Sequence, residues 1–385
     1  MKKLAIITSH PIQYNAPLFR LLTERNKIAI KVFYTWGQTK DGFVYDPDFK
    51  KAFKWDIPLL DGYEKEFVEN VSPNPSAGHF KGIMNKDLIE RIKLYQPDAL
   101  LVFGWSFKSH LQVLRYFKGK VNILFRGDST LLDETPGFSF KKAARRIFLK
   151  WVYHHIDAAL YTGIDNRDYF LAHGLRANQL YAAPHAIENE RFYDDEGKIE
   201  QQAIRWKKEL GIPATSIVFL FAGKLEPKKN PQIVIDALKE ITDSSIRLII
   251  VGNGKLEQAL KSKASNDQRI LFLDFQNQQQ MPVVYRLGHV FILPSSGPGE
   301  TWGLSINEAM ACGRPVIVSN KCGAAKDLVQ ENGFIFPAGN KNELVKAMCY
   351  FLNNQDLLKL YSANSLTQIQ QFGLTTIAAQ IETLV

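Results

Sequence analysis

Short apolar runs alternate with amphipathic segments along the whole chain. In the first half the apolar runs are nearly continuous rather than alternating, which is typical of strands in a parallel sheet covered on both faces. Amphipathic segments between them carry apolar residues at helical spacing, so the order of elements indicates βαβ units. The predicted strands are 3–8, 28–34, 98–104, 121–126 and 158–162, and the predicted helices are 16–25 and 85–95.

The second half repeats this pattern independently. Strands are predicted at 217–223, 246–252, 270–275, 290–296 and 314–320, and helices at 230–241, 256–264, 303–312 and 341–353. We therefore expect two doubly wound α/β domains, residues 1–190 and 191–365, followed by a helical segment at 366–385 that packs back on the first domain. The boundary lies in the acidic, turn-rich stretch 181–197. Open sheets of this kind bind ligands at the carboxyl ends of their strands, where loops carry the chemistry.

Composition excludes several classes of protein. The 385 residues are 45% hydrophobic and 23% charged, which excludes disordered, collagenous and disulfide-rich chains. Three cysteines without a Cys-x-x-Cys pair argue against a structural zinc site, and we expect buried thiols in a reducing compartment. The apolar run after the basic start is too short for a signal peptide, and no run approaches a membrane span. These features predict a cytoplasmic location.

The net charge of +9 is unevenly distributed. Residues 1–190 hold 27 basic and 20 acidic side chains, whereas residues 191–385 hold 21 and 19. A basic surplus attracts phosphates of nucleic acid, lipid headgroups or nucleotides. No helix-turn-helix, zinc-finger or aromatic RNA-binding pattern is present, so we expect no nucleic-acid partner.

The stretch 295–319 is the most informative for chemistry. Gly303 opens a predicted helix, whose first N–H groups, near Gly303, Leu304 and Ser305, are suited to a diphosphate. Glu308, further along this helix, is in reach of a ribose hydroxyl pair. Glu300, on the preceding loop, is suited to accept hydrogen bonds from sugar hydroxyls. The alternative is a solvated loop glutamate beside a glutamate that only stabilises the helix dipole.

Two lysines follow a buried strand in the second half. Lys224 comes directly after Gly223 at the strand's end, and Lys229 precedes the next helix. Cations at this spacing are able to clamp a phosphate chain. A lysine-rich solvated turn is the alternative, and it suits Lys228 better than Lys224.

Together these motifs resemble the family 4 glycosyltransferases, which are retaining enzymes of the GT-B fold. That fold has two facing Rossmann-like domains with a cleft between them. The resemblance covers the second domain almost continuously, through 223–230, 251–257, 290–296 and 300–319. It implies that Lys224 and Lys229 contact the donor diphosphate, Glu300 the transferred sugar and Glu308 the ribose, with backbone around 273–275, including Phe275, near the base. Lys224 replaces the arginine that the family usually has, which keeps the charge but loses the bidentate fork.

The first half matches the family less well. The start of residues 9–14, Ser-His-Pro-Ile-Gln-Tyr, resembles a subset of the family, and we predict that Gln13 and Tyr14 contact the acceptor. After the predicted strand 121–126, Arg126 and Asp128 occupy the stretch where many members carry a catalytic histidine. Asp128 and His10 are the candidates for that role, His10 having a packing role as its alternative, and Arg126 is assigned to the acceptor. His185 is interpreted as structural.

Two further segments have alternative readings. Asp46 and Asp48 form an Asp-x-Asp, a metal-binding signature in another glycosyltransferase fold, but no further oxygen ligands accompany them. We therefore expect no metal. Residues 141–155 form a basic amphipathic helix, suited to an anionic membrane or to packing on its own domain.

The sequence thus predicts a metal-independent retaining glycosyltransferase without a cofactor. Its donor substrate is a nucleotide diphosphate sugar, and its acceptor is a saccharide or lipid-linked saccharide, with peripheral association at the inner membrane face. Two alternatives stay open: a sugar-nucleotide epimerase or hydrolase of the same fold, and a non-catalytic protein that binds nucleotide sugars.

Overall fold

The computed structural model describes residues 1–37, 43–46, 51–194 and 196–385, and these form two compact units. The first contains Met1–Tyr45, Ala52–His185 and Leu374–Val385, and the second contains Asp46–Lys51 and Ala186–Gly373. The sequence-predicted boundary at residue 190 falls inside helix α6 (Asn189–Phe192) of the second unit. The segment that returns to the first unit begins at Leu374, and the helix before it remains in the second unit.

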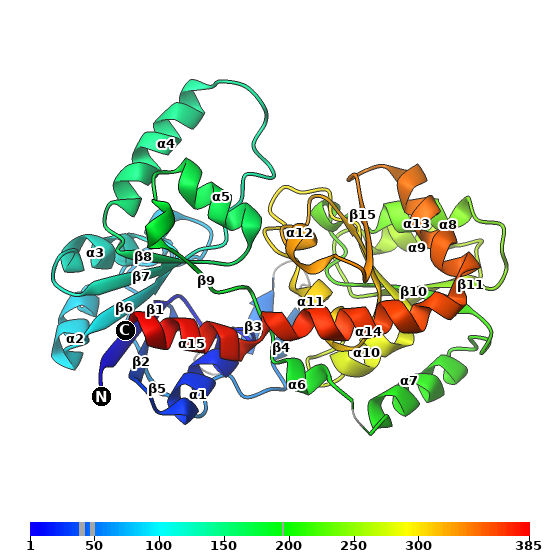
Figure 1. The fold of residues 1–385 in the computed structure, drawn as a ribbon, viewed down its shortest axis with the longest axis horizontal. Helices are drawn as coiled ribbons and strands as arrows, with labels where there is room; N and C mark the ends of the chain where they lie inside the picture. The colour runs from blue at the N-terminus through cyan, green and yellow to red at the C-terminus, as the bar shows by residue number, and fades with distance from the viewer. Residues whose placement is uncertain (38–42, 47–50, 195) are drawn as a thin grey trace. The chain divides into compact units, whose positions relative to one another are not determined.

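The first unit is built on a seven-stranded parallel sheet of order β5-β2-β1-β6-β7-β8-β9 (Figure 1). The strands are β1 Lys3–Thr8, β2 Ala29–Tyr34, β5 Glu64–Phe67, β6 Ala99–Phe103, β7 Asn122–Arg126, β8 Ala158–Tyr161 and β9 Leu180–Ala182. The helices are α1 Ala16–Arg25, α2 Leu88–Tyr95, α3 Lys108–Phe117, α4 Phe140–Tyr153, α5 Ile164–Ala172 and α15 Leu374–Leu384. A separate two-stranded sheet pairs β3 (Phe43–Asp46) with β4 (Lys51–Lys54).

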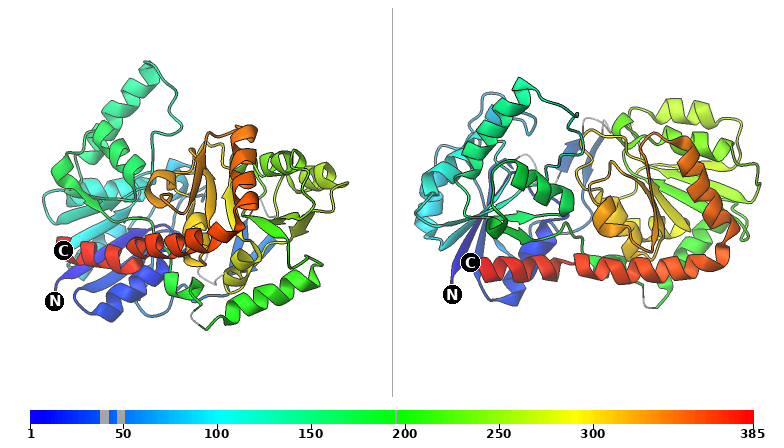
Figure 2. Two further views of the ribbon diagram at one scale, coloured as in Figure 1. Left: turned by 45° about the vertical axis from the view of Figure 1, so that its right-hand side comes forward. Right: turned by 45° about the horizontal axis from the view of Figure 1, so that its top comes forward.

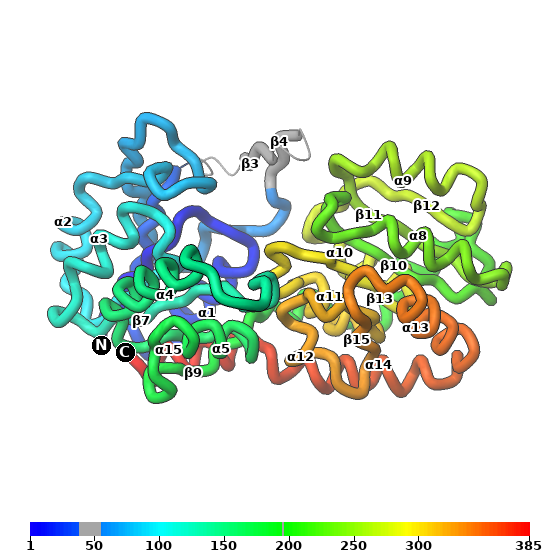
Figure 3. The backbone as a smooth tube through the Cα atoms, turned by 90° about the horizontal axis from the view of Figure 1, so that it is seen from above, coloured from blue at the N-terminus to red at the C-terminus, as the bar shows by residue number. Residues whose placement is uncertain are grey.

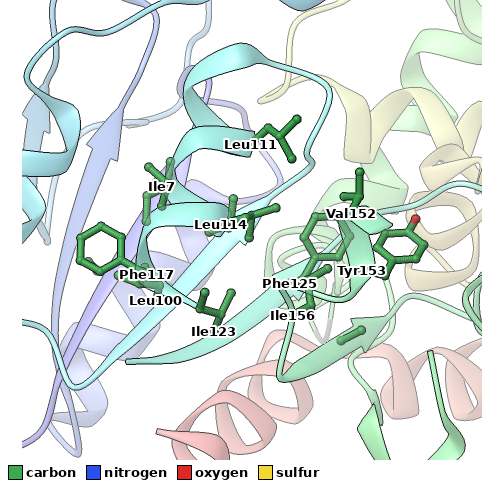
Figure 4. Packing of buried hydrophobic residues seen from close by; sticks show 14 of the residues in the cluster. Ile7, Leu100, Leu111, Leu114, Phe117, Ile123, Phe125, Val152, Tyr153 and Ile156 are labelled. Carbon is green, nitrogen blue, oxygen red and sulfur yellow. The ribbon is translucent and has the colours of Figure 1, made fainter. Parts of the chain in front are cut away.

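Apolar side chains fill both faces of this sheet because successive residues of a strand point to opposite sides. On one face, strand residues such as Leu100 and Phe125 pack against Leu114 of α3 and Tyr153 of α4 (Figure 4). On the other face α15 packs against α1 and β9, as Figure 2 shows. A bidentate ion pair between Arg25 and Glu382 ties α15 to α1, with a 2.6 Å Nε–Oε1 distance.

The second unit contains a six-stranded parallel sheet of order β12-β11-β10-β13-β14-β15. One helical layer contains α8, α9 and α13 (Figure 3), and another contains α6, α7, α10, α11 and α14. The strands are β10 Ile217–Ala222, β11 Ile246–Val251, β12 Ile270–Leu273, β13 Val290–Leu293, β14 Val316–Ser319 and β15 Gly333–Phe336. The remaining helices are α7 Lys198–Glu209, α8 Gln232–Lys239, α9 Glu257–Ala264, α10 Met281–Leu287, α11 Leu304–Ala311, α12 Ala325–Leu328, α13 Lys341–Asn353 and α14 Leu358–Ile369.

The three cysteines are free thiols in the second unit. Cys312 and Cys322 are buried, and Cys349 is half-buried. Burial raises the pKa of both Cys312 and Cys322 to about 11, so these two side chains stay protonated and act as small apolar groups. In the described part of the chain, no helix is long and apolar enough to cross a membrane.

Candidate functional site

An ion pair joins the loops that follow β10 and β13 in the second unit. The Lys229 Nζ lies 2.7 Å from Glu300 Oε2, although the two residues are 71 positions apart in the chain. The two strands are neighbours in the sheet, which brings their carboxyl ends together. Glu300 is only 8% exposed, and its Oε2 also accepts a hydrogen bond of 3.0 Å from Ser295 Oγ. The sequence predicted roles for both charged residues but not their pairing, and it did not identify Ser295.

The loop after β10 is held against the loop after β11 by close backbone approach. The N–H of Gly223 donates to Val251 O, and the N–H of Leu225 donates to Asn253 O. A Cβ on Gly252 would lie 2.2 Å from Gly223 O, so only glycine fits there. This packing fixes the path of the chain at Lys224, which follows Gly223. The short 3₁₀ turn Pro227–Lys229 then directs Lys229 toward Glu300.

The first turn of α11 begins at Leu304, shortly after Glu300 in the chain. Gly303 occupies the N-cap position with a φ of 99°, which favours glycine, and it provides no side-chain cap. The N–H groups of Leu304 and Ser305 belong to the first turn, which an α-helix leaves without intrahelical acceptors. The Ser305 hydroxyl is buried and has no hydrogen-bond partner within the described residues. This helix end therefore offers donors of the kind that an anion accepts from.

Two other predicted donor-site residues take part in hydrogen bonds, of which one is buried and one partly buried. Glu308, inside α11, is 3% exposed, and its Oε2 accepts a 2.6 Å hydrogen bond from the hydroxyl of Tyr285. The backbone N–H of Phe275, beyond β12, donates to Asn253 Oδ1 at 2.8 Å. The second unit therefore brings Gly223, Lys224, Lys229, Glu300 and the α11 start to one edge of its sheet, with Phe275 beyond a neighbouring strand.

The first unit holds the other predicted residues on separate loops. His10, Gln13 and Tyr14 lie in the loop between β1 and α1. His10 Nδ1 is 3.0 Å from Ser9 Oγ, and its ring meets Trp36 edge-on at 5.6 Å. Burial lowers the pKa of His10, which favours the neutral imidazole.

Arg126 ends β7 and is 5% exposed. Its guanidinium donates to the carbonyl oxygens of Ala183 (2.6 Å) and Pro184 (3.3 Å). Burial lowers the pKa of His185 to about 3, with the nearby Arg126 charge as a second cause, so His185 is neutral. Asp128 follows two residues after Arg126 in the same loop. The contacts of Arg126 therefore fix the chain just before it crosses to the second unit.

Sequence reasoning missed a buried polar network at the same edge of the first unit. His110, from α3, is fully buried, and its Nδ1 faces the carbonyl oxygens of Phe103 and Gly104. Because these oxygens only accept, Nδ1 carries the proton, and the unprotonated Nε2 lies 2.9 Å from the Thr35 hydroxyl, which also contacts Thr8 O at 3.2 Å. Burial lowers the pKa of His110 to about 4. The signal in the sequence was the position of His110 among the apolar residues of α3 that face the sheet.

The structure adds little on metal binding. Asp48 lies outside the described residues, as does the side chain of Asp46. Within the part of the chain that the structure describes, no group of three His, Cys, Asp or Glu side chains is placed to hold a metal ion.

Sequence comparisons match most of the second unit to known proteins. The family "Glycosyl transferases group 1" matches residues 202–367. The phosphatidyl-myo-inositol mannosyltransferase of Mycobacterium leprae is 30% identical over 175 residues, 44% of this chain and 46% of that protein. The chain thus spans about half the length of the first curated relatives that it matches. An Escherichia coli relative, UDP-Gal:alpha-D-GlcNAc-diphosphoundecaprenol alpha-1,3-galactosyltransferase, is 27% identical over 308 residues, 74% of each chain.

Comparison of structures confirms the fold. The Anabaena protein HepE, solved in complex with UDP and glucose, aligns with 99% of this chain and 98% of its own at a TM-score of 0.70. The sequence identity is 18%, so this likeness shows the fold alone. The protein therefore has the GT-B architecture of two Rossmann-like parallel-sheet domains.

Proposed function

We propose that this protein is a glycosyltransferase that moves a sugar from a nucleoside diphosphate donor to a hydroxyl of a saccharide or lipid-linked saccharide. The observation that carries the proposal is the Lys229–Glu300 ion pair beside the uncapped start of α11. A diphosphate sugar requires cations and N–H donors for its phosphates and an acceptor group for its sugar hydroxyls. Groups of these kinds lie together at the carboxyl edge of the second sheet, which supports the proposal.

In the proposed reaction the bond between the sugar C1 and the diphosphate oxygen breaks, and the acceptor oxygen bonds to C1 on the same face. The acceptor's proton passes to a phosphate oxygen of the leaving diphosphate, and the anomeric configuration is retained because the acceptor attacks from the face that the diphosphate leaves. Lys224, Lys229 and the α11 N–H groups stabilise the negative charge that develops on that diphosphate. Because protein cations supply this charge, we propose that no metal ion or other cofactor is needed.

The roles in the first unit remain proposals of the same kind. We assign Gln13 and Tyr14 to acceptor binding, and His10 and Asp128 to the role of the usual family histidine, whereas the contacts of Arg126 with the carbonyl oxygens of Ala183 and Pro184 favour a structural role for this arginine. The Ser-His-Pro-Ile-Gln-Tyr start supports membership of a subset of the family. The Escherichia coli relative acts, by its name, on a diphosphoundecaprenol-linked sugar, which supports a lipid-linked acceptor and a peripheral cytoplasmic location here.

The proposal is tested by comparing two adjacent lysines. Lys229 pairs with Glu300, whereas Lys228 pairs with Glu226 at 3.5 Å. Lys229→Ala should weaken UDP binding about tenfold to a hundredfold in calorimetry, the range expected for a charge-assisted hydrogen bond, and should raise the donor KM. Lys228→Ala should change each of these less than threefold.

Turnover assays separate the alternatives. Sugar transfer that depends on an added saccharide or lipid-linked acceptor supports the transferase, and transfer that persists in EDTA supports metal independence. Epimer formation or complete hydrolysis of the donor without acceptor would instead identify an epimerase or hydrolase. Failure to bind any nucleotide sugar or nucleoside diphosphate would contradict the proposed site.

A further inference from the structure

Helix α4 of the first unit carries an exposed apolar stripe that the proposed reaction does not use. The stripe follows positions i, i+4, i+7, i+8 and i+11 of the helix, which lie on one face. Phe140 is 86% exposed and Ile147 is 73% exposed, values far above those of ordinary domain-facing side chains. The α4 stripe consists of Phe140, Ala144, Ile147, Phe148 and Trp151.

The opposite face of α4 already provides its contact with the domain. Leu149, Val152 and Tyr153 are buried and belong to the core cluster beneath the helix, and Figure 4 shows Val152 and Tyr153 in it. In Figures 1 and 2, α4 projects from the rest of the first unit. Packing on its own domain therefore accounts for one apolar face of α4 and leaves the α4 stripe uncovered.

Positive charge flanks the α4 stripe on both sides. Residues 140–154 contain five lysines and arginines and no aspartate or glutamate. Lys141 and Arg145 lie on one flank of the helix, and Arg146 and Lys150 lie on the other. Arg146 is 3.9 Å from Glu134, and Arg145 donates to the Tyr169 hydroxyl. An exposed apolar face between rows of cations is the arrangement of helices that lie in the interface of anionic membranes.

A cavity adjoins the α4 stripe and shares its residues, and its volume lies within the range of about 300–1,000 Å³ that is typical of ligand sites. Its volume is 860 Å³, and Ile147 and Trp151 contribute to its lining along with Lys150 and Arg176. The carboxylate in the lining, Asp157, is engaged by Lys118 at 2.5 Å and by the N–H of Ile123. Neither Lys150 nor Arg176 forms an ion pair with any residue that the structure describes. The cavity is therefore cationic beside an apolar rim.

We propose that the α4 stripe and this cavity form one docking surface for an anionic lipid bilayer. The α4 stripe enters the boundary between headgroups and acyl chains, and the cavity receives a lipid phosphate through Lys150 and Arg176. The cations that flank the α4 stripe favour an anionic bilayer over a neutral apolar partner. The exposed aromatic side chains favour a lipid over a free phosphate ion. This inference deepens the proposed function. It rests on that function in one respect only, namely that the acceptor is lipid-linked.

Flotation of the full chain with vesicles tests the surface. We expect binding to vesicles of phosphatidylglycerol and phosphatidylcholine, and at least about tenfold weaker binding to phosphatidylcholine alone, since each cation near an anionic surface strengthens binding severalfold. The pair Phe140→Ser and Ile147→Ser should weaken binding about tenfold or more because it removes exposed apolar area. The pair Lys150→Gln and Arg176→Gln should weaken binding about tenfold and reduce its dependence on salt.

Matched controls carry the same chemical changes on the second unit. Ile204→Ser with Leu360→Ser removes two exposed apolar side chains there, and Arg205→Gln with Lys208→Gln removes two exposed cations. Both control pairs should bind vesicles as the unchanged protein does. UDP binding, measured in every sample, reports on the proposed function separately, so loss of UDP binding with intact flotation would reject the transferase site and retain this surface.

Four outcomes would overturn the inference. The first is no flotation with anionic vesicles, and the second is flotation that the α4 and cavity variants leave unchanged. The third is saturable binding of glycerol phosphate in the cavity without vesicle binding, which would identify a site for a free phosphate. Self-association that the α4 variants abolish, in the absence of flotation, would identify a second copy of the chain as the partner and contradict the bilayer.

Discussion

Both units place charged or titratable side chains near the carboxyl ends of their parallel strands, but the partners of these side chains differ between the units. In the second unit, Lys229 and Glu300 are paired with each other through flexible side chains. In the first, Arg126 is bound to main-chain carbonyl groups and His110 is buried as a neutral ring. A side chain that pairs with another side chain is able to exchange that partner for a ligand. A side chain that donates to buried backbone carbonyl groups cannot leave without depriving those oxygens of their donor, which is unfavourable.

Replacing Glu300 should give the largest effect. Glu300→Gln keeps the shape and removes the charge, so transfer should fall about a hundredfold to a thousandfold in turnover if the carboxylate stabilises the reacting sugar. UDP should bind as well or more tightly because Lys229 loses its internal partner. Steady-state kinetics and calorimetry check both, with Glu226→Gln as the control on the neighbouring loop. Equal turnover of the Glu300→Gln and Glu226→Gln variants would contradict the proposal that the Glu300 carboxylate stabilises the reacting sugar.

Replacing Arg126 should act on stability first. Arg126→Met should cost about 2–4 kcal/mol of unfolding free energy because the carbonyls of Ala183 and Pro184 lose their donors. Arg145→Met, which removes an exposed guanidinium from the Tyr169 hydroxyl, should cost less than about 1 kcal/mol. Denaturant unfolding measures both. A stable Arg126 variant that binds acceptor poorly would show that this arginine serves the ligand instead.

The smallest effect concerns pH. The pKa of His110 is about 4 in the folded chain and its usual value is 6.5, so only the unfolded chain takes up the proton between these values. The contribution of neutral His110 to the free energy of unfolding is complete above pH 6.5 and is lost as the pH falls toward 4. About 2 kcal/mol of it is already lost at pH 5. His110→Gln should flatten the decline in unfolding free energy between pH 7 and 5, whereas the exposed His154→Gln should not. An unchanged slope would contradict the neutral assignment of His110.

Local pattern predicted much of the fold. The predicted helices 16–25 and 341–353 coincide with α1 and α13. In α13, apolar spacing is reinforced by Asn340, whose side chain accepts the N–H of Glu343. The four-residue strand β15 was not predicted because its place depends on tertiary packing. A Cβ on Gly333 would lie 1.8 Å from Val316 O, so the strand requires a glycine against its neighbour.

The candidate site shows the same division between local and distant information. The sequence identified Lys229 and Glu300 separately, but their pairing depends on β10 lying next to β13, which no local pattern contains. For α4, the sequence showed apolar and basic residues on one helix without indicating which apolar face the domain covers. Only the burial of Leu149 and Val152 distinguishes the two faces.

The order of segments also has a consequence for synthesis. The first unit is completed by α15, which follows the whole second unit in the chain and packs on α1 and β9. At about 5–20 residues per second, a ribosome needs about 10–40 s to produce the intervening segment. During that time the surface of α1 that α15 will cover stays exposed, while the second unit is free to fold as soon as it emerges. The first unit, although translated first, is therefore the later of the two to be finished.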